Sequence, residues 1–332
     1  MKRFFIIVGG LALLAAGLGP ALHTYWSHYW GPDIDEAALA YDIGDYETAM
    51  DNYLPFAEGG TEKNNLIAMF NVALMYEKGQ GVTQNYDDAE MWFTRAAELG
   101  NVESQNKLGH AYEYGDWGTE DFDRALLFYG MAADQGDVFA QGSLARMYLN
   151  NPKGDTLPKA VKWLQKAVDG RDAFSEAALA YLYETGNGVP LNPERAFNLY
   201  RRAAKQSVPF AQNKLANIYH AGVLVPQDYK LAHRYFTFAA EQQDIDAQIN
   251  LAEMYARGEG MPRDLVKAYM WLSVASALQN ASGQNASGPN HSEKKQYAKA
   301  LLANVMQGMA SDQIEKGDAL VEKCLKKTLM RC

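Results

Sequence analysis

Cysteine is nearly absent from this chain, which holds only Cys324 and Cys332 among its 332 residues. So low a number excludes a disulfide-rich scaffold and a multi-cysteine zinc site. The two cysteines could still pair in an oxidising compartment. On one continuous helix, however, their separation corresponds to about 12 Å of rise, which is too long for a disulfide. We therefore expect a Cys324–Cys332 bridge only if the chain unwinds between them, with free thiols or an intermolecular bond as the alternatives.

Clusters of basic residues are also missing. The formal net charge is −9, and no stretch concentrates Lys and Arg. Proteins that bind nucleic acid need a positive surface to neutralise phosphates. The sequence therefore predicts no nucleic acid partner.

Signatures of catalysis and of metal binding are absent as well. The six histidines include no pair at helical ligand spacing and no His-Glu-x-x-His motif. No Ser or Cys lies in a nucleophile motif such as Gly-x-Ser-x-Gly. Glycine loops such as residues 79–81 lie between two predicted helices, whereas a phosphate-binding loop follows a strand. We expect no enzyme activity, no metal or other cofactor and no small-molecule substrate.

Only one long apolar run is present in the sequence, at residues 4–22, directly after Lys2 and Arg3. This run is long enough to span a bilayer and is longer than a typical signal-peptide core. The aromatic residues at 25–30 suit a membrane interface, but the small residues at 19–21 could form a cleavage site. Residues 1–22 are therefore either an uncleaved membrane anchor or a signal sequence that is removed. In both cases the positive-inside rule places the rest of the chain outside the cytoplasm.

The most abundant feature is an internal repeat with a nearly constant period. A tyrosine recurs in steps of 36, 36, 35, 36 and 36 residues. These framework tyrosines are Tyr76, Tyr112, Tyr148, Tyr183, Tyr219 and Tyr255. A fixed period of this length is typical of stacked supersecondary units rather than of a globular domain.

Each period predicts a pair of helices separated by a glycine loop. The second helix carries framework alanines at Ala89, Ala125, Ala160, Ala196, Ala232 and Ala268. Three residues after each alanine stands a large apolar residue: Trp92, Phe128, Trp163, Leu199, Tyr235 and Trp271. Small residues let two helices approach closely, and large ones fill the space between them. We expect these large side chains to be buried.

These offsets together resemble the Sel-1-like repeat family, a longer-looped relative of the tetratricopeptide repeat. The resemblance rests on an Ala-x3-Leu-Ala/Gly-x2-Tyr helix, a Gly-x-Gly loop and an Ala-x2-Trp-x3-Ala-Ala helix. It implies an all-α fold, a right-handed α/α superhelical solenoid of helix-turn-helix repeats. The loops at residues 150–154 and 222–224 depart from the family pattern, although the helices around them fit it.

The repeats divide the chain into successive segments. We expect a linker and a degenerate N-terminal capping repeat at residues 23–63, and six Sel-1-like repeats at residues 64–279. A flexible loop rich in Asn, Ser and Gly follows at residues 280–292, and capping helices close the chain at residues 293–332. Atypical terminal units are expected because a solenoid must cover its two exposed ends.

The first helix of each repeat also has positions where the residue changes from repeat to repeat. They lie five and two residues before the framework tyrosine, and one residue after it. By resemblance to tetratricopeptide arrays, this helix lines the concave surface where peptides or partner helices dock. The candidate partner-binding residues are His110, Arg146, Tyr181, Asn217, Glu253, Lys107, Lys214, Glu77, Glu113 and Glu184.

Taken together, these features predict a non-catalytic scaffold or adaptor of the bacterial cell envelope that binds another envelope protein or peptide. We expect it in the periplasm, tethered to the inner membrane by residues 4–22, or soluble in the periplasm or secreted if the signal is cleaved. One alternative is a cell-wall protein that binds or hydrolyses peptidoglycan or β-lactams, because some members of the resembled family are linked to that chemistry. A second alternative is a structural accessory subunit of a membrane complex.

Overall fold

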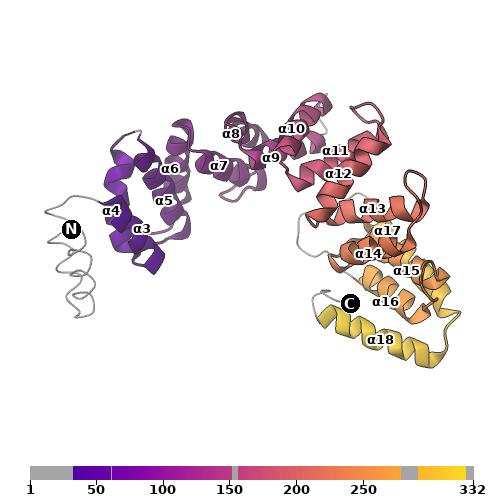
Figure 1. Cartoon of the computed structure of the whole chain (residues 1–332). Coiled ribbons are helices and arrows are strands. Elements are labelled where there is room, and N and C mark those ends of the chain that lie inside the picture. The colour runs from indigo at the N-terminus through magenta and orange to yellow at the C-terminus, as the bar shows by residue number, and fades with distance from the viewer. Residues whose placement is uncertain (1–32, 61, 152–155, 278–290, 327–332) are drawn as a thin grey trace, which may run out of the picture. The chain divides into compact units, whose positions relative to one another are not determined.

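The computed structural model of the chain describes residues 33–60, 62–151, 156–277 and 291–326. These ranges contain sixteen helices and no strand (Figure 1). Consecutive helices pack on one another from residue 34 to residue 134 and from residue 157 to residue 306, as α5 (Lys63–Lys78) does on α6 (Tyr86–Glu98) and α6 on α7 (Val102–Tyr114). The predicted all-α solenoid of helical hairpins is therefore confirmed.

The helices fall into two compact units, residues 1–144 and 145–332. The first unit contains α3 (Ile34–Ile43), α4 (Tyr46–Glu58), α5 (Lys63–Lys78), α6 (Tyr86–Glu98), α7 (Val102–Tyr114) and α8 (Phe122–Asp134). Helix α9 (Val138–Asn150) spans the boundary between the units. The second unit continues with α10 (Leu157–Asp169), α11 (Ala173–Thr185), α12 (Pro193–Lys205), α13 (Pro209–Ala221), α14 (Tyr229–Glu241), α15 (Ile245–Arg257), α16 (Leu265–Ala277), α17 (His291–Met306) and α18 (Ser311–Lys326).

Local side-chain chemistry sets the ends of the helices. At the start of α6, the Asn85 side chain accepts hydrogen bonds from the backbone N–H groups of Asp87 and Asp88. At the end of α5, Gly79 adopts the left-handed conformation with φ of 67°. An N-cap side chain satisfies backbone donors that the helix leaves open, and glycine enters the left-handed region without a steric penalty. The loop between the two helices of a repeat follows from these two signals.

The predicted core pattern is largely, but not entirely, correct. All six framework alanines are buried, and Trp271 is only 3% exposed. The expectation of burial is wrong for Trp163 and Tyr235, which are each only partly buried. The Trp163 ring lies under the ammonium group of Lys166, 4.2 Å from it, and the Tyr235 ring stacks on Tyr219. Each ring is thus covered in part by a neighbouring side chain, a lysine for Trp163 and a tyrosine for Tyr235, and the rest of it stays exposed.

Buried glutamines connect neighbouring repeats. The Gln105 side chain in α7 donates a 2.8 Å hydrogen bond to the backbone carbonyl of Ala97 in α6. Gln248 in α15 makes the same bond, of 3.0 Å, to Ala240 in α14. Both glutamines stand seven residues before a framework tyrosine. A bond of this kind satisfies a carbonyl left open at a helix C-terminus, inside the core.

In α11 a glutamate, Glu176, takes the position of these glutamines and is fully buried. An ionised carboxylate cannot donate a hydrogen bond. The donor is instead Arg202 in α12, whose guanidinium bonds the backbone carbonyl of Val168 at 3.2 Å and forms an ion pair with Glu176. Glu176 and Arg202 together thus provide the hydrogen bond to the preceding helix that a single glutamine side chain provides in other repeats.

Extra helices flank the repeats at both ends. At the N-terminal end, α3 and α4 form a hairpin with a tight turn at Gly44, and α4 packs on α5. At the C-terminal end, α17 and α18 both pack on α16. The Tyr269 hydroxyl of α16 donates a 2.7 Å hydrogen bond to Asp318 of α18. Helix α17 begins at His291, inside the range where we expected a flexible loop.

Several predictions concern residues outside the described ranges. They are the signal or anchor at residues 1–22, the loop at residues 280–290 and the second cysteine, Cys332. Cys324 is buried, with its sulfur 3.3 Å from that of Met270, and its bond to Cys332 stays a prediction. Among the described helices, none is long and apolar enough to cross a membrane.

Candidate partner-binding surface

We call the variable surface of the first helices the first-helix face. In each repeat it comprises the residues nine, five and two before the framework tyrosine, and the residue one after it. The predicted positions are here extended by the one nine residues earlier, because residues at i, i+4 and i+7 share one side of a helix. The face is described separately for the two compact units.

In the first unit, charged residues of this face bind one another. Lys107 of α7 and Glu77 of α5 form an ion pair of 2.8 Å, so the two predicted residues come together. Glu77 also accepts a 3.0 Å hydrogen bond from the Trp117 indole nitrogen. His110 does not join them and instead contacts Asp116, 2.9 Å away. These contacts hold neighbouring first helices together, so the side chains already have partners within the chain.

The first unit also places Glu113 against its own hairpin. The Tyr129 hydroxyl in α8 donates a 3.3 Å hydrogen bond to Glu113. Arg146, which lies on α9 beyond the unit boundary, is partly buried. The side chains of Glu113 and Arg146 are therefore both only partly exposed to solvent.

In the second unit, the same arrangement recurs between α11 and α13. Lys214 and Glu184 form an ion pair of 2.8 Å, and the Tyr200 hydroxyl donates a 2.7 Å hydrogen bond to Glu184. Burial, reinforced by this hydrogen bond, raises the pKa of Tyr200 above its ordinary value. The phenol therefore stays protonated and continues to donate.

Three exposed aromatic side chains lie on this part of the face. Phe174, Tyr181 and Phe210 are 66%, 44% and 39% exposed. The rings of Tyr181 and Phe210 lie edge to face with their centroids 6.1 Å apart. The Lys214 ammonium lies over both rings, at 5.3 and 5.6 Å from their centroids. We predicted Tyr181 and Lys214 but missed the two phenylalanines, which the i, i+4, i+7 pattern could have identified.

The remaining predicted residues are engaged in other contacts. Asn217 donates a 3.0 Å hydrogen bond to the backbone carbonyl of Asn213, on its own helix. Glu253 binds Arg257 and accepts a 3.2 Å hydrogen bond from Tyr297 of α17. The capping helix α17 thus contacts this face at α15. Phe174, Tyr181 and Phe210 give the face an open aromatic part on α11 and α13.

No group of three or more His, Cys, Asp or Glu side chains able to hold a metal ion occurs in the described part of the chain. Two ion pairs of the first-helix face, Lys107–Glu77 and Lys214–Glu184, instead join neighbouring repeats. The arrangement on α11 and α13 provides apolar contact area and one cation, which suits binding of another protein.

Comparison with known proteins identifies the repeat. Six consecutive copies of the Sel1 repeat match residues 66–101, 102–137, 139–172, 173–208, 209–244 and 245–280. The chain belongs to the Sel1 repeat family. Sel1 repeat proteins are generally protein-interaction scaffolds and are generally non-catalytic.

Two solved structures show the same Sel1 architecture. A protective antigen of uropathogenic Escherichia coli with a Sel1-like repeat fold is 25% identical, with a TM-score of 0.65, over 88% of this chain and 63% of that one. A Sel1 repeat protein from Oxalobacter formigenes is 26% identical, with a TM-score of 0.59, over 73% of this chain and 98% of that one. This chain therefore spans less than two thirds of the length of the Escherichia coli antigen.

Proposed function

We propose that this Sel1 repeat protein is a non-catalytic adaptor of the bacterial cell envelope that holds a partner protein on the first-helix face of α11 and α13. The observation that carries the proposal is the exposed group of Phe174, Tyr181 and Phe210. Large aromatic side chains at the surface are frequent anchors of protein interfaces because they bury much area at a small entropic cost.

The contacts around this aromatic group indicate the kind of partner. The charge of Lys214 is already balanced by Glu184, so an acidic partner group would compete with an existing ion pair. An apolar side chain can instead cover the three rings without breaking that pair. We therefore expect a partner segment that presents aliphatic or aromatic residues, such as one face of an amphipathic helix.

The proposed location rests on residues 4–22. Their apolar run after two basic residues supports export, either as an inner-membrane anchor or as a cleaved signal. Mass spectrometry of the mature N-terminus distinguishes these two outcomes. Detection of the chain only in the cytoplasm, with residues 1–22 retained, would contradict the envelope proposal.

Site-specific photocrosslinking in the native cell tests the binding surface. A photoreactive phenylalanine analogue placed at residue 174, 181 or 210 is expected to give the same protein adduct at all three positions. Residue 127 in α8 is the matched control, because Leu127 is 58% exposed but belongs to a second helix. The triple variant Phe174→Ala, Tyr181→Ala, Phe210→Ala is expected to lose copurification of the crosslinked protein. A partner retained by that variant would reject this surface.

A further inference from the structure

A cation–tyrosine contact recurs on the second helices. In four repeats the residue before the framework alanine is basic, and its charged group lies 4.6–5.5 Å from the centroid of a framework tyrosine ring. The pairs are Arg124 with Tyr112, Lys159 with Tyr148, Arg195 with Tyr183 and Lys267 with Tyr255. Because the contact recurs, the residues that surround the cation and the tyrosine can be compared between repeats.

In the second repeat, a carboxylate from the preceding hairpin completes this contact. Glu90 of α6 accepts hydrogen bonds from both the Tyr112 hydroxyl and the Arg124 guanidinium, the latter at 3.1 Å. Arg124 also donates a 2.8 Å hydrogen bond to the Tyr112 hydroxyl. Burial, together with the hydrogen bond to Glu90, raises the pKa of Tyr112 to about 12. Cation, phenol and carboxylate thus form a closed triad.

In the fourth repeat the same position lacks its carboxylate. The residue of α10 that corresponds to Glu90 is Val161, one after the framework alanine of the preceding repeat. Among the described residues, Arg195 has no carboxylate partner, and the Tyr183 hydroxyl has no hydrogen bond. The basic and phenolic parts of the triad are therefore present, and the acidic part is missing.

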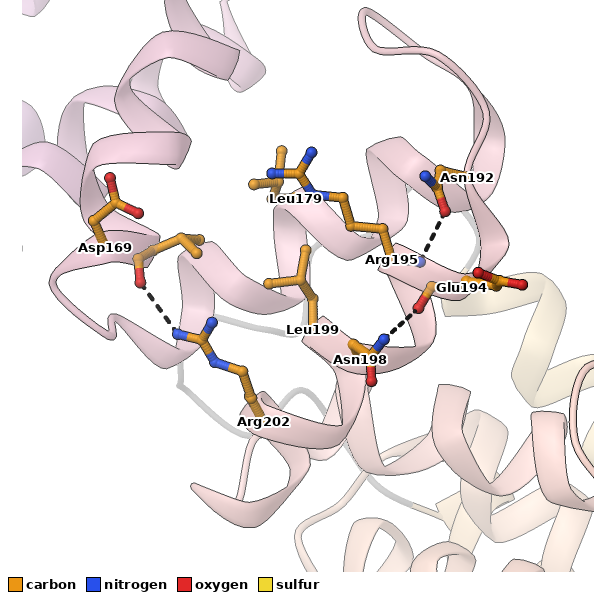
Figure 2. A pocket seen from close by; sticks show the side chains of 9 residues that line it. Asp169, Leu179, Asn192, Glu194, Arg195, Asn198, Leu199 and Arg202 are labelled. Atoms are coloured by element: carbon orange, nitrogen blue, oxygen red, sulfur yellow. Dashed lines mark hydrogen bonds between the residues drawn. The ribbon is translucent and has the colours of Figure 1, made fainter.

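A cavity of about 420 Å³ lies beside Arg195, between α10 and α12 (Figure 2). Its apolar lining comes from Val168, Leu179 and Leu199. Figure 2 shows the Arg195 guanidinium extending from α12 toward Leu179. The second arginine of the lining, Arg202, is held by Val168 and Glu176 as described above. Arg195 is therefore the lining cation that remains available to a ligand within the described part of the chain.

Acidic residues of the lining limit what the cavity can accept. Asp169 and Glu194 both line it. In Figure 2 the Glu194 carboxylate points away from Arg195. Two nearby negative charges disfavour a strongly anionic ligand. A single carboxylate with an apolar neighbour fits both the arginine and the leucines.

We propose that this cavity binds one carboxylate group, presented by an acidic side chain of a partner protein segment. The carboxylate accepts hydrogen bonds from Arg195, which lines the cavity and corresponds to Arg124 of the closed triad. Leu179 and Leu199 contact the aliphatic part of the segment. The site lies on the second helices and does not rest on the aromatic group of the first-helix face.

An internal carboxylate tests the geometry without any ligand. The substitution Val161→Glu is expected to rebuild the triad and to raise the melting temperature above that of Val161→Gln, which has the same size but no charge. The difference should disappear when Arg195→Gln is added. Equal melting temperatures of Val161→Glu and Val161→Gln would overturn the proposed geometry.

Binding is measured on the full chain with capped peptides that carry Leu-Glu-Leu, compared with Leu-Gln-Leu. We expect at least about tenfold tighter binding of the glutamate peptide, in keeping with a charge-assisted hydrogen bond. Arg195→Gln and Val161→Glu should each remove this preference, whereas Arg124→Gln, at the closed triad, should not. Glu90→Val is expected to open a second site of the same kind.

Two further ligands define the source of the carboxylate. N-acetylglutamate tests whether a free small molecule suffices, and a Glu-Glu-Glu peptide tests for simple charge attraction. The proposal expects the Leu-Glu-Leu peptide to bind more tightly than either. Stronger binding of N-acetylglutamate would reject a protein segment as the ligand, and a preference for Glu-Glu-Glu that persists in Arg195→Gln would reject the cavity.

Discussion

The residue that joins one hairpin to the next adopts the left-handed conformation in five repeats. Glycine holds this position at Gly100 and Gly136, whereas Arg171, Ser207 and Gln243 adopt it with φ of 66°, 65° and 70°. A side chain makes this conformation unfavourable by about 1–2 kcal/mol. The three later junctions therefore contain local strain that the surrounding packing maintains.

Replacing these residues by glycine should stabilise the protein. We expect Arg171→Gly, Ser207→Gly and Gln243→Gly each to raise the free energy of unfolding by about 1 kcal/mol, because the strain exceeds the greater entropy of an unfolded glycine. Urea denaturation measures the change. The reverse substitution Gly136→Ser is the control and should lower stability. A loss of stability in all three glycine variants would contradict the interpretation.

Asp244, which begins α15, predicts a dependence of stability on pH. Burial raises the pKa of Asp244 to about 6 from an ordinary value of 3.8, although the hydrogen bond from Ala247 opposes the shift. The folded state therefore binds this proton more tightly than the unfolded state does. Its stabilising contribution is complete below about pH 3.8 and is lost as the pH rises through about 6.

Asp244→Asn should remove this dependence, because asparagine caps a helix as well as aspartate does. We expect the variant to gain stability relative to the parent between pH 4 and pH 6, with a constant difference above that range. Urea denaturation at successive pH values measures it. Asp244→Ala, which also lacks the cap, should be less stable than Asp244→Asn by about 1 kcal/mol. A difference between Asp244→Asn and the parent that does not vary with pH would refute the assignment.

At the scale of the element, helix α18 is positioned by close contact with α16. Gly317 of α18 lies against the ring of Tyr269, and a Cβ atom added to Gly317 would overlap that ring. The Tyr269 hydroxyl is fixed at the same time by Asp318. The glycine thus lets the two helices approach until this hydrogen bond forms.

Gly317→Ala should loosen α18. Since the added methyl group must displace either the ring or the helix, we expect a loss of about 1–3 kcal/mol and faster amide exchange in α18. Gly308→Ala is the matched control, because its Cβ would lie 3.5 Å from Leu265, an ordinary contact distance. Similar amide exchange of α18 in the two variants would show that the contact does not position the helix.

Much of the element level was predictable from the sequence, since many helices begin at Asn or Asp and most first helices end at glycine, and both signals are local. The framework tyrosines likewise marked the register of the first helices. Burial of Trp163 was predicted wrongly because exposure depends on how adjacent repeats cover a side chain. The cavity at Arg195 was missed for the same reason, as part of its lining, Val168 and Asp169, comes from a different hairpin. Phe174 and Phe210 were missed although their spacing from Tyr181 and Lys214 was visible.

At the scale of the whole molecule, each repeat is stabilised by its immediate neighbours. Buried glutamines, the Glu176–Arg202 pair and the Lys–Glu ion pairs all join adjacent helices or adjacent repeats. In arrays of this kind, stability is close to a sum of contributions from single repeats and from the contacts between neighbours. Damage at one end should therefore remain local.

Deleting residues 291–332 tests this expectation, because it removes both helices that cover α16. We expect amide protection to fall in α15 and α16, whose core includes contacts with Ala298 and Cys324. Protection in α5 and α6, in the other compact unit, should be unchanged and serves as the internal control. Equal loss of protection throughout the chain would contradict the nearest-neighbour interpretation.

The pairing of Glu176 with Arg202 restricts the order in which these two residues could have replaced neutral ones. If arginine appeared first at position 202, while position 176 still held a glutamine, the Val168 carbonyl would still have a hydrogen-bond donor. A glutamate introduced first places a carboxylate against the Val168 carbonyl, with no proton between them, at a position closed to water. The route through arginine is therefore the accessible one, and a chain that reverts only residue 202 should fold poorly while a chain that reverts only residue 176 should not.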